Sequence, residues 1–236
     1  MNRPSIIVIP FLLSVCSSGF AADNRQAADG QKWQTLFNGK DLSGWQTASG
    51  KTPASGWVVE KGALVRKPGA GMIWTKRRFG NFILEMEFKT EGNSGIFFRT
   101  DKPKDCVQTG FEMQVYRAVK KPGKHSCGAV YDALAPSKDV VKDGQWNRVV
   151  IAAVDNQITI KMNGQQIIDM DLDRWTEPNK NPDGSKNKFR TPLKQFKREG
   201  HVGLQDHGAN VSFRNIRIKP LAEKRPAPGG QAQPAR

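Results

Sequence analysis

The stretch Phe82-Ile83-Leu84-Glu85-Met86-Glu87-Phe88-Lys89 places its largest apolar side chains at every second position. Phe82, Leu84, Met86 and Phe88 therefore share one face, and the charged residues lie on the other. This period of two predicts a β-strand that buries one face against a core.

Further short segments of the same kind extend in both directions from this stretch. Strands are predicted over residues 57–60, 63–65, 95–99, 111–116, 149–154, 157–163, 165–170, 202–205 and 211–219. Tight turns are expected at Asp155-Asn156 and Asn163-Gly164. A bulge is expected near Arg214-Asn215, because the parity of the apolar residues changes there. Many strands and almost no helical pattern favour an all-β sandwich or barrel.

The N-terminal residues have the layout of a secretory signal peptide. A positive charge at Arg3 precedes an apolar run over 6–15, and the small residues Ala21 and Ala22 follow. We therefore expect export to the periplasm or the extracellular space. Lipid attachment at Cys16 is the second alternative, and it is the only route by which we expect the membrane as a partner.

The rest of the chain is divided by composition. We predict a signal peptide over 1–22, a linker over 23–32, one domain over 33–221 and a disordered tail over 222–236. The tail is rich in Pro, Gly, Ala and Gln and has little to bury. One sandwich domain fits the length that remains.

Removal of the signal peptide leaves two cysteines, Cys106 and Cys127. In an oxidising compartment such a pair is first interpreted as a disulfide, with two free thiols as the alternative. No CxxC spacing is present, which argues against a cysteine-based zinc site.

The net charge is +15, and the segment from Arg174 to Arg198 holds eight basic residues against only Glu177 and Asp183. This basic segment is compatible with an anionic partner, which could be an acidic polysaccharide, lipid headgroups or a wall polymer, and equally with a solvated loop that only keeps the protein soluble. Export and the absence of a recognised motif argue against nucleic acid as a partner.

The predicted strand over 110–116 is the most informative for chemistry. Its odd positions are apolar, so Glu112, Gln114 and Tyr116 share the other face. A carboxylate, an amide and a phenol in one row can exchange hydrogen bonds with sugar hydroxyls, and the carboxylate can serve as acid or base. An ordinary solvent-facing row is the alternative.

Other polar residues are candidates on weaker grounds. Histidine is scarce in this chain, which draws attention to His125 and to His207, while Arg99 and the outward pair Glu85 and Glu87 could line a groove. A structural or exposed histidine and surface ion pairs are the alternatives. Further groove candidates are Tyr131, Asp132, Gln205 and Asp206.

No GxSxG, HExxH, P-loop or Rossmann pattern occurs. The paired carboxylates of ordinary glycosidases are also not evident, since Gln114 stands where a second acid is expected. The residues therefore favour either binding alone or chemistry that needs a single acid/base group.

Several motifs together give the chain a family resemblance. They are Leu36-Phe37-Asn38-Gly39-Lys40-Asp41-Leu42-Ser43-Gly44-Trp45, Asn93-Ser94-Gly95-Ile96-Phe97-Phe98-Arg99, Gly110-Phe111-Glu112-Met113-Gln114-Val115, Gly128-Ala129-Val130-Tyr131, Gly144-Gln145-Trp146-Asn147 and Gly203-Leu204-Gln205-Asp206-His207-Gly208. In this order they resemble the exported family called the 3-keto-disaccharide hydrolase domain. The resemblance implies a concanavalin-A-like jelly-roll sandwich of two antiparallel sheets with a sugar-binding concave face. Many relatives have an acidic residue where this chain has Tyr116-Arg117. A role that rests on a carboxylate at this position is therefore not expected for this chain.

The resemblance also implies an activity, the cleavage of glycosides that carry a ketone at carbon 3. Such a ketone acidifies the proton at carbon 2, so one general base can start the elimination of the group at carbon 1. Under this hypothesis Glu112 or His125 is the base, and Arg99 and His207 lie near the developing oxyanion.

Three hypotheses follow for function. The first is this enzyme, with Glu85, Glu87, Gln114, Tyr131, Asp132, Gln205 and Asp206 as the substrate-binding set. The second is a non-catalytic sugar-binding module on the same face, and the third is an adhesive protein whose basic segment meets an anionic polymer. In each the partner is an oligo- or polysaccharide. No cofactor is specified with certainty, and a divalent metal is left open.

Overall fold

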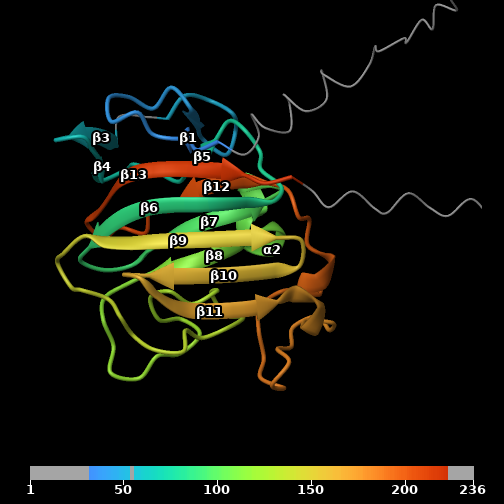
Figure 1. Ribbon diagram of the computed structural model, residues 1–236. Helices are drawn as coiled ribbons and strands as arrows, with labels where there is room; N and C mark the ends of the chain where they lie inside the picture. Colours follow the sequence, from blue (N-terminus) through green and yellow to red (C-terminus); the bar gives the residue numbers. More distant parts are fainter. Residues whose placement is uncertain (1–31, 54–55, 223–236) are drawn as a thin grey trace, which may run out of the picture.

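A computed structural model describes residues 32–53 and 56–222 of the chain. The predicted signal peptide lies outside these residues, as do nearly all of the predicted linker and tail. Within the described part no helix is long and apolar enough to cross a membrane. The architecture is two antiparallel sheets packed face to face, with few helical turns, as the alternation predicts (Figure 1).

The larger sheet, sheet A, forms the front layer of Figure 1. Its strand order is β11 (Gln165–Asp171), β10 (Gln157–Met162), β9 (Asn147–Val154), β6 (Phe82–Thr90), β13 (Val211–Pro220), β4 (Ala63–Arg66) and β3 (Trp57–Glu60), with β1 (Gln34–Thr35) paired to β13. The stretch that opened the sequence analysis is therefore a central strand, between β9 and β13.

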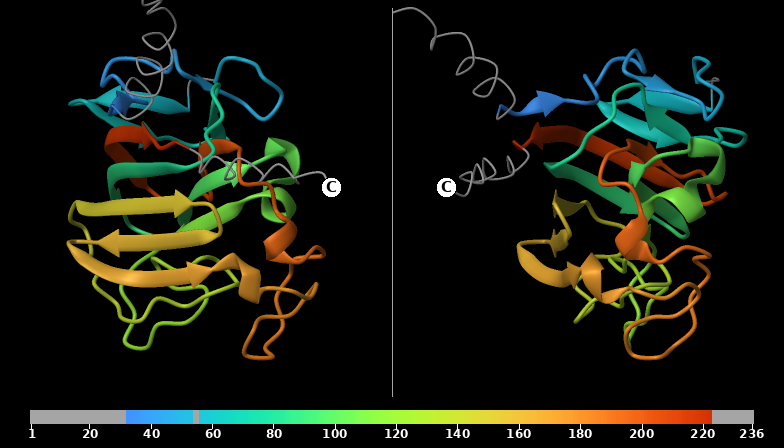
Figure 2. Two further views of the ribbon diagram at one scale, coloured as in Figure 1. Left: turned by 45° about the vertical axis from the view of Figure 1, so that its right-hand side comes forward. Right: turned by 90° about the vertical axis from the view of Figure 1, so that its right-hand side faces the viewer.

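The smaller sheet, sheet B, lies behind sheet A, and Figure 2 shows the two layers from other sides. Its order is β2 (Trp45–Gln46), β5 (Ile73–Thr75), β12 (His201–Leu204), β7 (Ser94–Thr100) and β8 (Phe111–Val115). The helical turns are η1 (Pro103–Asp105), α2 (Cys106–Thr109), η2 (Leu172–Arg174) and η3 (Leu193–Gln195). Two long connections join the sheets: 116–146 links β8 to β9, and 175–200 links η2 to β12.

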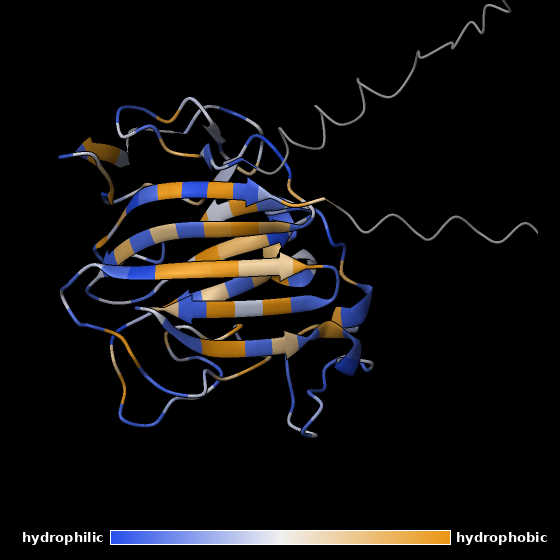
Figure 3. Cartoon of the chain, viewed as in Figure 1, coloured by the Kyte–Doolittle hydropathy of each residue, from blue (hydrophilic) through white to orange (hydrophobic). Residues whose placement is uncertain are grey.

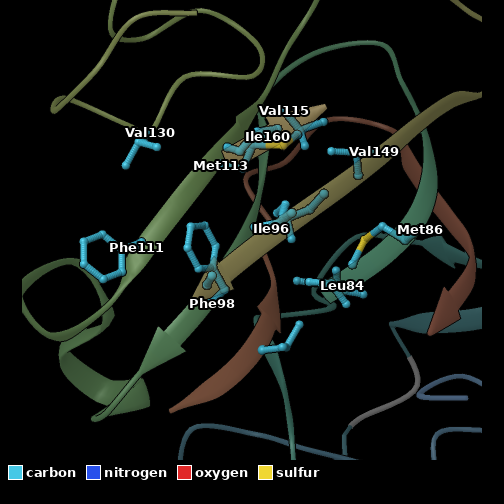
Figure 4. Packing of buried hydrophobic residues seen from close by; sticks show 14 of the residues in the cluster. Leu84, Met86, Ile96, Phe98, Phe111, Met113, Val115, Val130, Val149 and Ile160 are labelled. Atoms are coloured by element: carbon cyan, nitrogen blue, oxygen red, sulfur yellow. The ribbon is translucent and has the colours of Figure 1, made fainter. Parts of the chain in front are cut away.

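The core lies between the two sheets. Side chains from β6, β7, β8, β9 and β10 point toward one another there (Figure 4). Phe82, Leu84, Met86 and Phe88 are fully buried, so the predicted inner face of β6 is confirmed. Figure 3 shows the matching alternation of apolar and polar residues along the strands of sheet A.

The predicted turns and the bulge are confirmed by backbone geometry. Asp155, Asn163 and Gly164 have positive φ angles, as tight hairpin turns require. The β13–β6 register shifts between Arg214 and Arg217, and Asn215 has a φ of 53°. The shift allows Ile216 and Ile218 to enter the core although their parity differs from that of the preceding apolar residues.

The predicted disulfide is wrong, because both cysteines are free. Cys106 lies in α2 near the carboxyl group of Glu112. Burial raises the pKa of the Cys106 thiol, and the charge of Glu112 raises it further. Cys127 packs into the core beside the backbone of Tyr116, and burial raises the pKa of its thiol to about 12. The two thiols therefore lie in different surroundings, one partly exposed and one buried.

Candidate functional site

The predicted polar row of β8 lies on the outer face of sheet B. In the ladder Glu112 is opposite Phe97, which in turn lies beside Gly203, and Gly203 lies opposite Trp74. Residues that are paired across strands project from the same face of a sheet. Phe97 and Trp74 are buried but do not belong to the core cluster between the sheets. The outer face therefore has aromatic side chains next to the carboxylate.

The second row of this face is polar. Gln114 is paired with Gly95, and the backbone N–H of Gln205 donates to the oxygen of Gly95 at 3.0 Å. The Gln114 amide donates to Asn93 Oδ1 at 2.9 Å. Within the described part of the chain, Gln205 Oε1 and Trp74 Nε1 are buried without a hydrogen-bond partner. Buried groups of this kind are rare in folded proteins and identify places where a ligand or water is expected.

Glu112 is the most perturbed acid on this face. It is 9% exposed, and burial raises the pKa of its carboxyl group to about 7, with Lys188 and Gln205 acting in the opposite direction. The carboxylate occupies space that a side chain at position 95 would fill. A pocket of about 10 Å³ beside it has room for roughly one water molecule. A carboxyl group poised near neutral pH suits general acid/base catalysis.

The connection after β8 brings a second group of predicted residues to the same place. The Tyr131 N–H donates to the backbone oxygen of Glu112 at 2.8 Å, so this loop is tied to the strand. Burial, followed by the charges of Glu112 and Asp132, raises the pKa of the Tyr131 phenol. The phenol therefore stays protonated at neutral pH and can donate a hydrogen bond to a sugar oxygen.

Asp132 organises this loop. Its Oδ1 lies 2.9 Å from His125 Nε2 and 3.0 Å from Lys124 Nζ. Although burial opposes it, hydrogen bonds from Lys124 and His125 lower the pKa of the Asp132 carboxyl group. The His125 ring contacts Tyr131 with 4.8 Å between centroids. A carboxylate that holds one imidazole nitrogen orients the ring and fixes its tautomer.

Lys188 completes the cluster, and the sequence analysis did not single it out. The backbone N–H of Lys188 donates to Asp132 Oδ2 at 2.8 Å. The side-chain Nζ lies 3.9 Å from the centroid of the Tyr131 ring. The residue belongs to the basic segment, whose charge alone gave no reason to prefer one lysine. Its contacts with Asp132 and Tyr131, both distant in the sequence, reveal it.

Two predicted residues lie on the other sheet. Glu85 and Glu87 project from the outer face of sheet A, because β6 belongs to that sheet. Glu85 forms ion pairs with Arg148 and Arg217, and Glu87 pairs with Arg214. They line a separate pocket of about 420 Å³. The expectation that they share a groove with Glu112 is therefore wrong, since alternation does not reveal which sheet a strand joins.

Arg99 is placed apart from the open face as well. Between Phe97 and Thr100, β7 carries an extra residue relative to β12, and Arg99 has a φ of 49°. The side chain is fully buried, and its guanidinium donates to the backbone oxygens of Gly80 and Asp155 and to Asn81 Oδ1. This placement gives Arg99 a structural role and gives no support to a role at an oxyanion.

Asp206 and His207 are neighbours in the sequence, but their side chains have different surroundings. Asp206 accepts hydrogen bonds from Arg66, Gly71 and Gly208, so its carboxylate fastens the loop after β12. His207 is exposed, and within the described residues no hydrogen bond of its ring is found. It follows Gln205 by two residues, in the loop after β12.

No metal centre is evident from the side chains. The described residues include no group of three or more His, Cys, Asp and Glu side chains that could hold a metal ion. A divalent metal therefore has no ready chelating set in this part of the chain.

The sandwich, together with a face of aromatic and polar side chains around one perturbed carboxyl group, defines a carbohydrate-active β-sandwich protein. Comparison with known sequences makes this specific. The chain belongs to the family described as the 3-keto-alpha-glucoside-1,2-lyase-like domain, whose profile matches residues 32–219. The resemblance noted from the sequence motifs is thereby confirmed.

Individual relatives agree with this assignment. A 3-keto-disaccharide hydrolase of Bacteroides thetaiotaomicron is 27% identical over 231 residues, which cover 82% of this chain and 80% of that protein. The crystal structure of a proposed glycosyl hydrolase from Parabacteroides distasonis is 32% identical with a TM-score of 0.73, covering 80% of this chain and 100% of the other. A galectin-like protein of Bacillus subtilis, at 10% identity and a TM-score of 0.51 over 82% of this chain and 96% of its own, shares the fold alone.

Proposed function

We propose that this protein cleaves 3-keto-glycosides by elimination and hydration, with Glu112 as the general base. The observation that carries the proposal is the buried Glu112 carboxyl group on a sugar-compatible face of sheet B, with its pKa raised to about 7. The named hydrolase relative supports the substrate class.

The reaction suits a site with one such carboxylate. Glu112 takes the proton from carbon 2, and the electron pair forms an enolate with carbon 3. The enolate then collapses: the carbonyl group at carbon 3 re-forms, a double bond forms between carbons 1 and 2, and the bond from carbon 1 to the leaving oxygen breaks. Water then adds, placing hydroxyl on carbon 1 and hydrogen on carbon 2. Matching the pKa of the base to the working pH makes such proton transfer efficient.

The neighbouring groups have complementary roles in this proposal. His125, oriented by Asp132 at 2.9 Å, gives a proton to the leaving oxygen. Gln114, Gln205 and Tyr131 hold sugar hydroxyls. Trp74 and Phe97 are buried beneath this face and pack against each other, with 5.5 Å between their centroids. We also propose that the protein works outside the cytoplasm, a proposal that rests on the residues over 1–22.

The test is incubation with a 3-keto disaccharide and with its unoxidised parent in D₂O and in ¹⁸O-labelled water. We expect cleavage of the keto substrate alone, with deuterium at carbon 2 and ¹⁸O at carbon 1. Glu112→Gln should abolish cleavage, and Glu85→Gln, a matched change on the opposite sheet, should leave it intact. Cleavage of the parent at the same rate would overturn the proposal.

A non-catalytic sugar-binding module is the second candidate. The observation that favours it is that Glu112 is buried, whereas Tyr131 and Gln205 beside it are partly exposed and can bind a sugar without contact to the carboxylate. Binding of the keto disaccharide, measured by calorimetry, without any turnover would support this candidate over the first.

A further inference from the structure

Lys188 is the exposed residue among those that line the small pocket beside Glu112. The two side chains line this pocket together with Phe97, Tyr131 and Phe189. The Lys188 side chain is open to solvent, whereas the Glu112 carboxylate lies beneath the surface. A ligand that reaches Glu112 by this route therefore passes the Lys188 ammonium group.

The ammonium group of Lys188 is held in place by its neighbours, but no carboxylate forms an ion pair with it in the described part of the chain. The backbone of residue 188 is fixed by Asp132 Oδ2, and Nζ lies over the Tyr131 ring at 3.9 Å. Cation–π contact favours the charged form. Within residues 32–53 and 56–222, Lys188 makes no ion pair, although its charge acts on Glu112. Its three donors are thus free for an oxygen atom between it and the carboxylate.

We infer that Lys188 is a catalytic residue that donates a hydrogen bond to the carbonyl oxygen at carbon 3 and stabilises the enolate formed when Glu112 removes the proton at carbon 2. The inference rests on the proposed function. It assigns to Lys188 the role for which Arg99 is unavailable, since the guanidinium of Arg99 is bonded to internal acceptors.

The charges around Lys188 are consistent with this role. Desolvation lowers the pKa of its ammonium group, and the nearby Glu112, Asp132 and Cys106 act in the opposite direction. The C2–H bond breaks, its proton passes to Glu112, and the electron pair moves to the carbonyl oxygen. A cation already in place for that new charge needs little reorganisation during the reaction.

The test compares Lys188→Ala with Lys186→Ala, a change of equal charge two residues away on the same loop. The hydrogen bond from the backbone N–H of residue 188 to Asp132 Oδ2 can form in either variant. We expect Lys188→Ala to lower kcat by about 10²–10³-fold with little change in KM, as for the loss of one oxyanion donor. Lys186→Ala should match the unaltered protein.

Two further readouts separate chemistry from structure. Ethylamine should restore part of the kcat of Lys188→Ala in a saturable way, and the acidic limb of its pH–rate profile should move to higher pH because Glu112 loses a neighbouring cation. A loss of kcat without amine rescue and with an unmoved limb would overturn the inference. So would unchanged kcat, or trapping of Lys188 as a secondary amine by borohydride, which indicates an imine. Absence of turnover by the unaltered protein would instead overturn the proposed function itself, and the inference with it.

Discussion

A Cβ atom at position 95 would lie 2.3 Å from Oε1 of Glu112, so the missing side chain of Gly95 is what admits the carboxylate to the face of sheet B. The two residues are neighbours across β7 and β8, where Gly95 is paired with Gln114. Glycine is needed here for space, since the φ angle of Gly95 is not among the positive ones. The close approach of a functional side chain explains a glycine inside a strand.

Gly95→Ala is therefore expected to damage activity more than stability. The clash is with the end of a flexible side chain, which can turn away at a cost of about 1 kcal/mol. The displaced carboxylate should lower kcat by roughly 10²-fold, because small misplacements of reacting groups are costly. Urea unfolding and steady-state kinetics measure the two effects. Gly123→Ala, which meets no atom within 4 Å, is the control. A stability loss without a kinetic effect would contradict this explanation.

Glu112→Gln is expected to stabilise the protein at alkaline pH. The pKa of Glu112 is about 7 in the folded protein, against an ordinary value of 4.5. Between these values the folded state binds more protons than the unfolded state, so stability falls as pH rises through this window. Glutamine stays neutral and avoids this loss. The gain should be roughly 1–3 kcal/mol at about pH 8 and vanish below about pH 4.

Urea unfolding of both proteins at the two pH values measures this gain. The same difference at both values would show that packing, rather than ionisation, separates the variants.

Glu85→Gln is expected to leave kcat/KM unchanged. Glu85 projects from sheet A and is occupied by Arg148 and Arg217. Its ion pairs are partly exposed, so stability should change by about 1 kcal/mol or less. A steady-state assay on the keto disaccharide measures the first effect. A large kinetic loss would indicate that the substrate reaches the outer face of sheet A.

The contrast between Glu85 and Glu112 shows how far the sequence reaches. Alternation along β6 and β8 predicted correctly which side chains enter the core, since that depends only on neighbours within one strand. It could not assign β6 and β8 to different sheets, because that depends on pairing between distant strands. Strands of two or three residues, such as β2 and β5, are too short to show any period.

The candidate site was predicted in part for the same reason. Glu112 and Gln114 lie on one regular strand, and their common face follows from the period. Lys188 lies in an irregular loop, and contacts with residues distant in the sequence, such as its backbone bond to Asp132, 56 residues away, bring it to the site. Arg99 was misassigned because the extra residue in β7 turns its side chain inward, a local event that one sequence does not announce.

Arg99→Met is expected to destabilise the fold and spare the chemistry. The change leaves the acceptors of Gly80, Asn81 and Asp155 buried without the guanidinium. Losing hydrogen bonds from a buried charged donor should cost about 3 kcal/mol or more. Urea unfolding measures this loss, and kcat per folded molecule should stay unchanged at low temperature. Arg190→Met, on an exposed side chain, is the control. Lost kcat at unchanged stability would return Arg99 to the catalytic set.

The two free thiols should differ in reactivity. Cys106 is partly accessible in α2, whereas Cys127 is buried in the core and burial raises the pKa of its thiol to about 12. Because the thiolate is the reactive form, iodoacetamide should label Cys106 slowly in the folded protein and Cys127 only after unfolding. Peptide mapping by mass spectrometry identifies each labelled residue. A peptide pair joined through Cys106 and Cys127 would contradict the structure, in which both thiols are free.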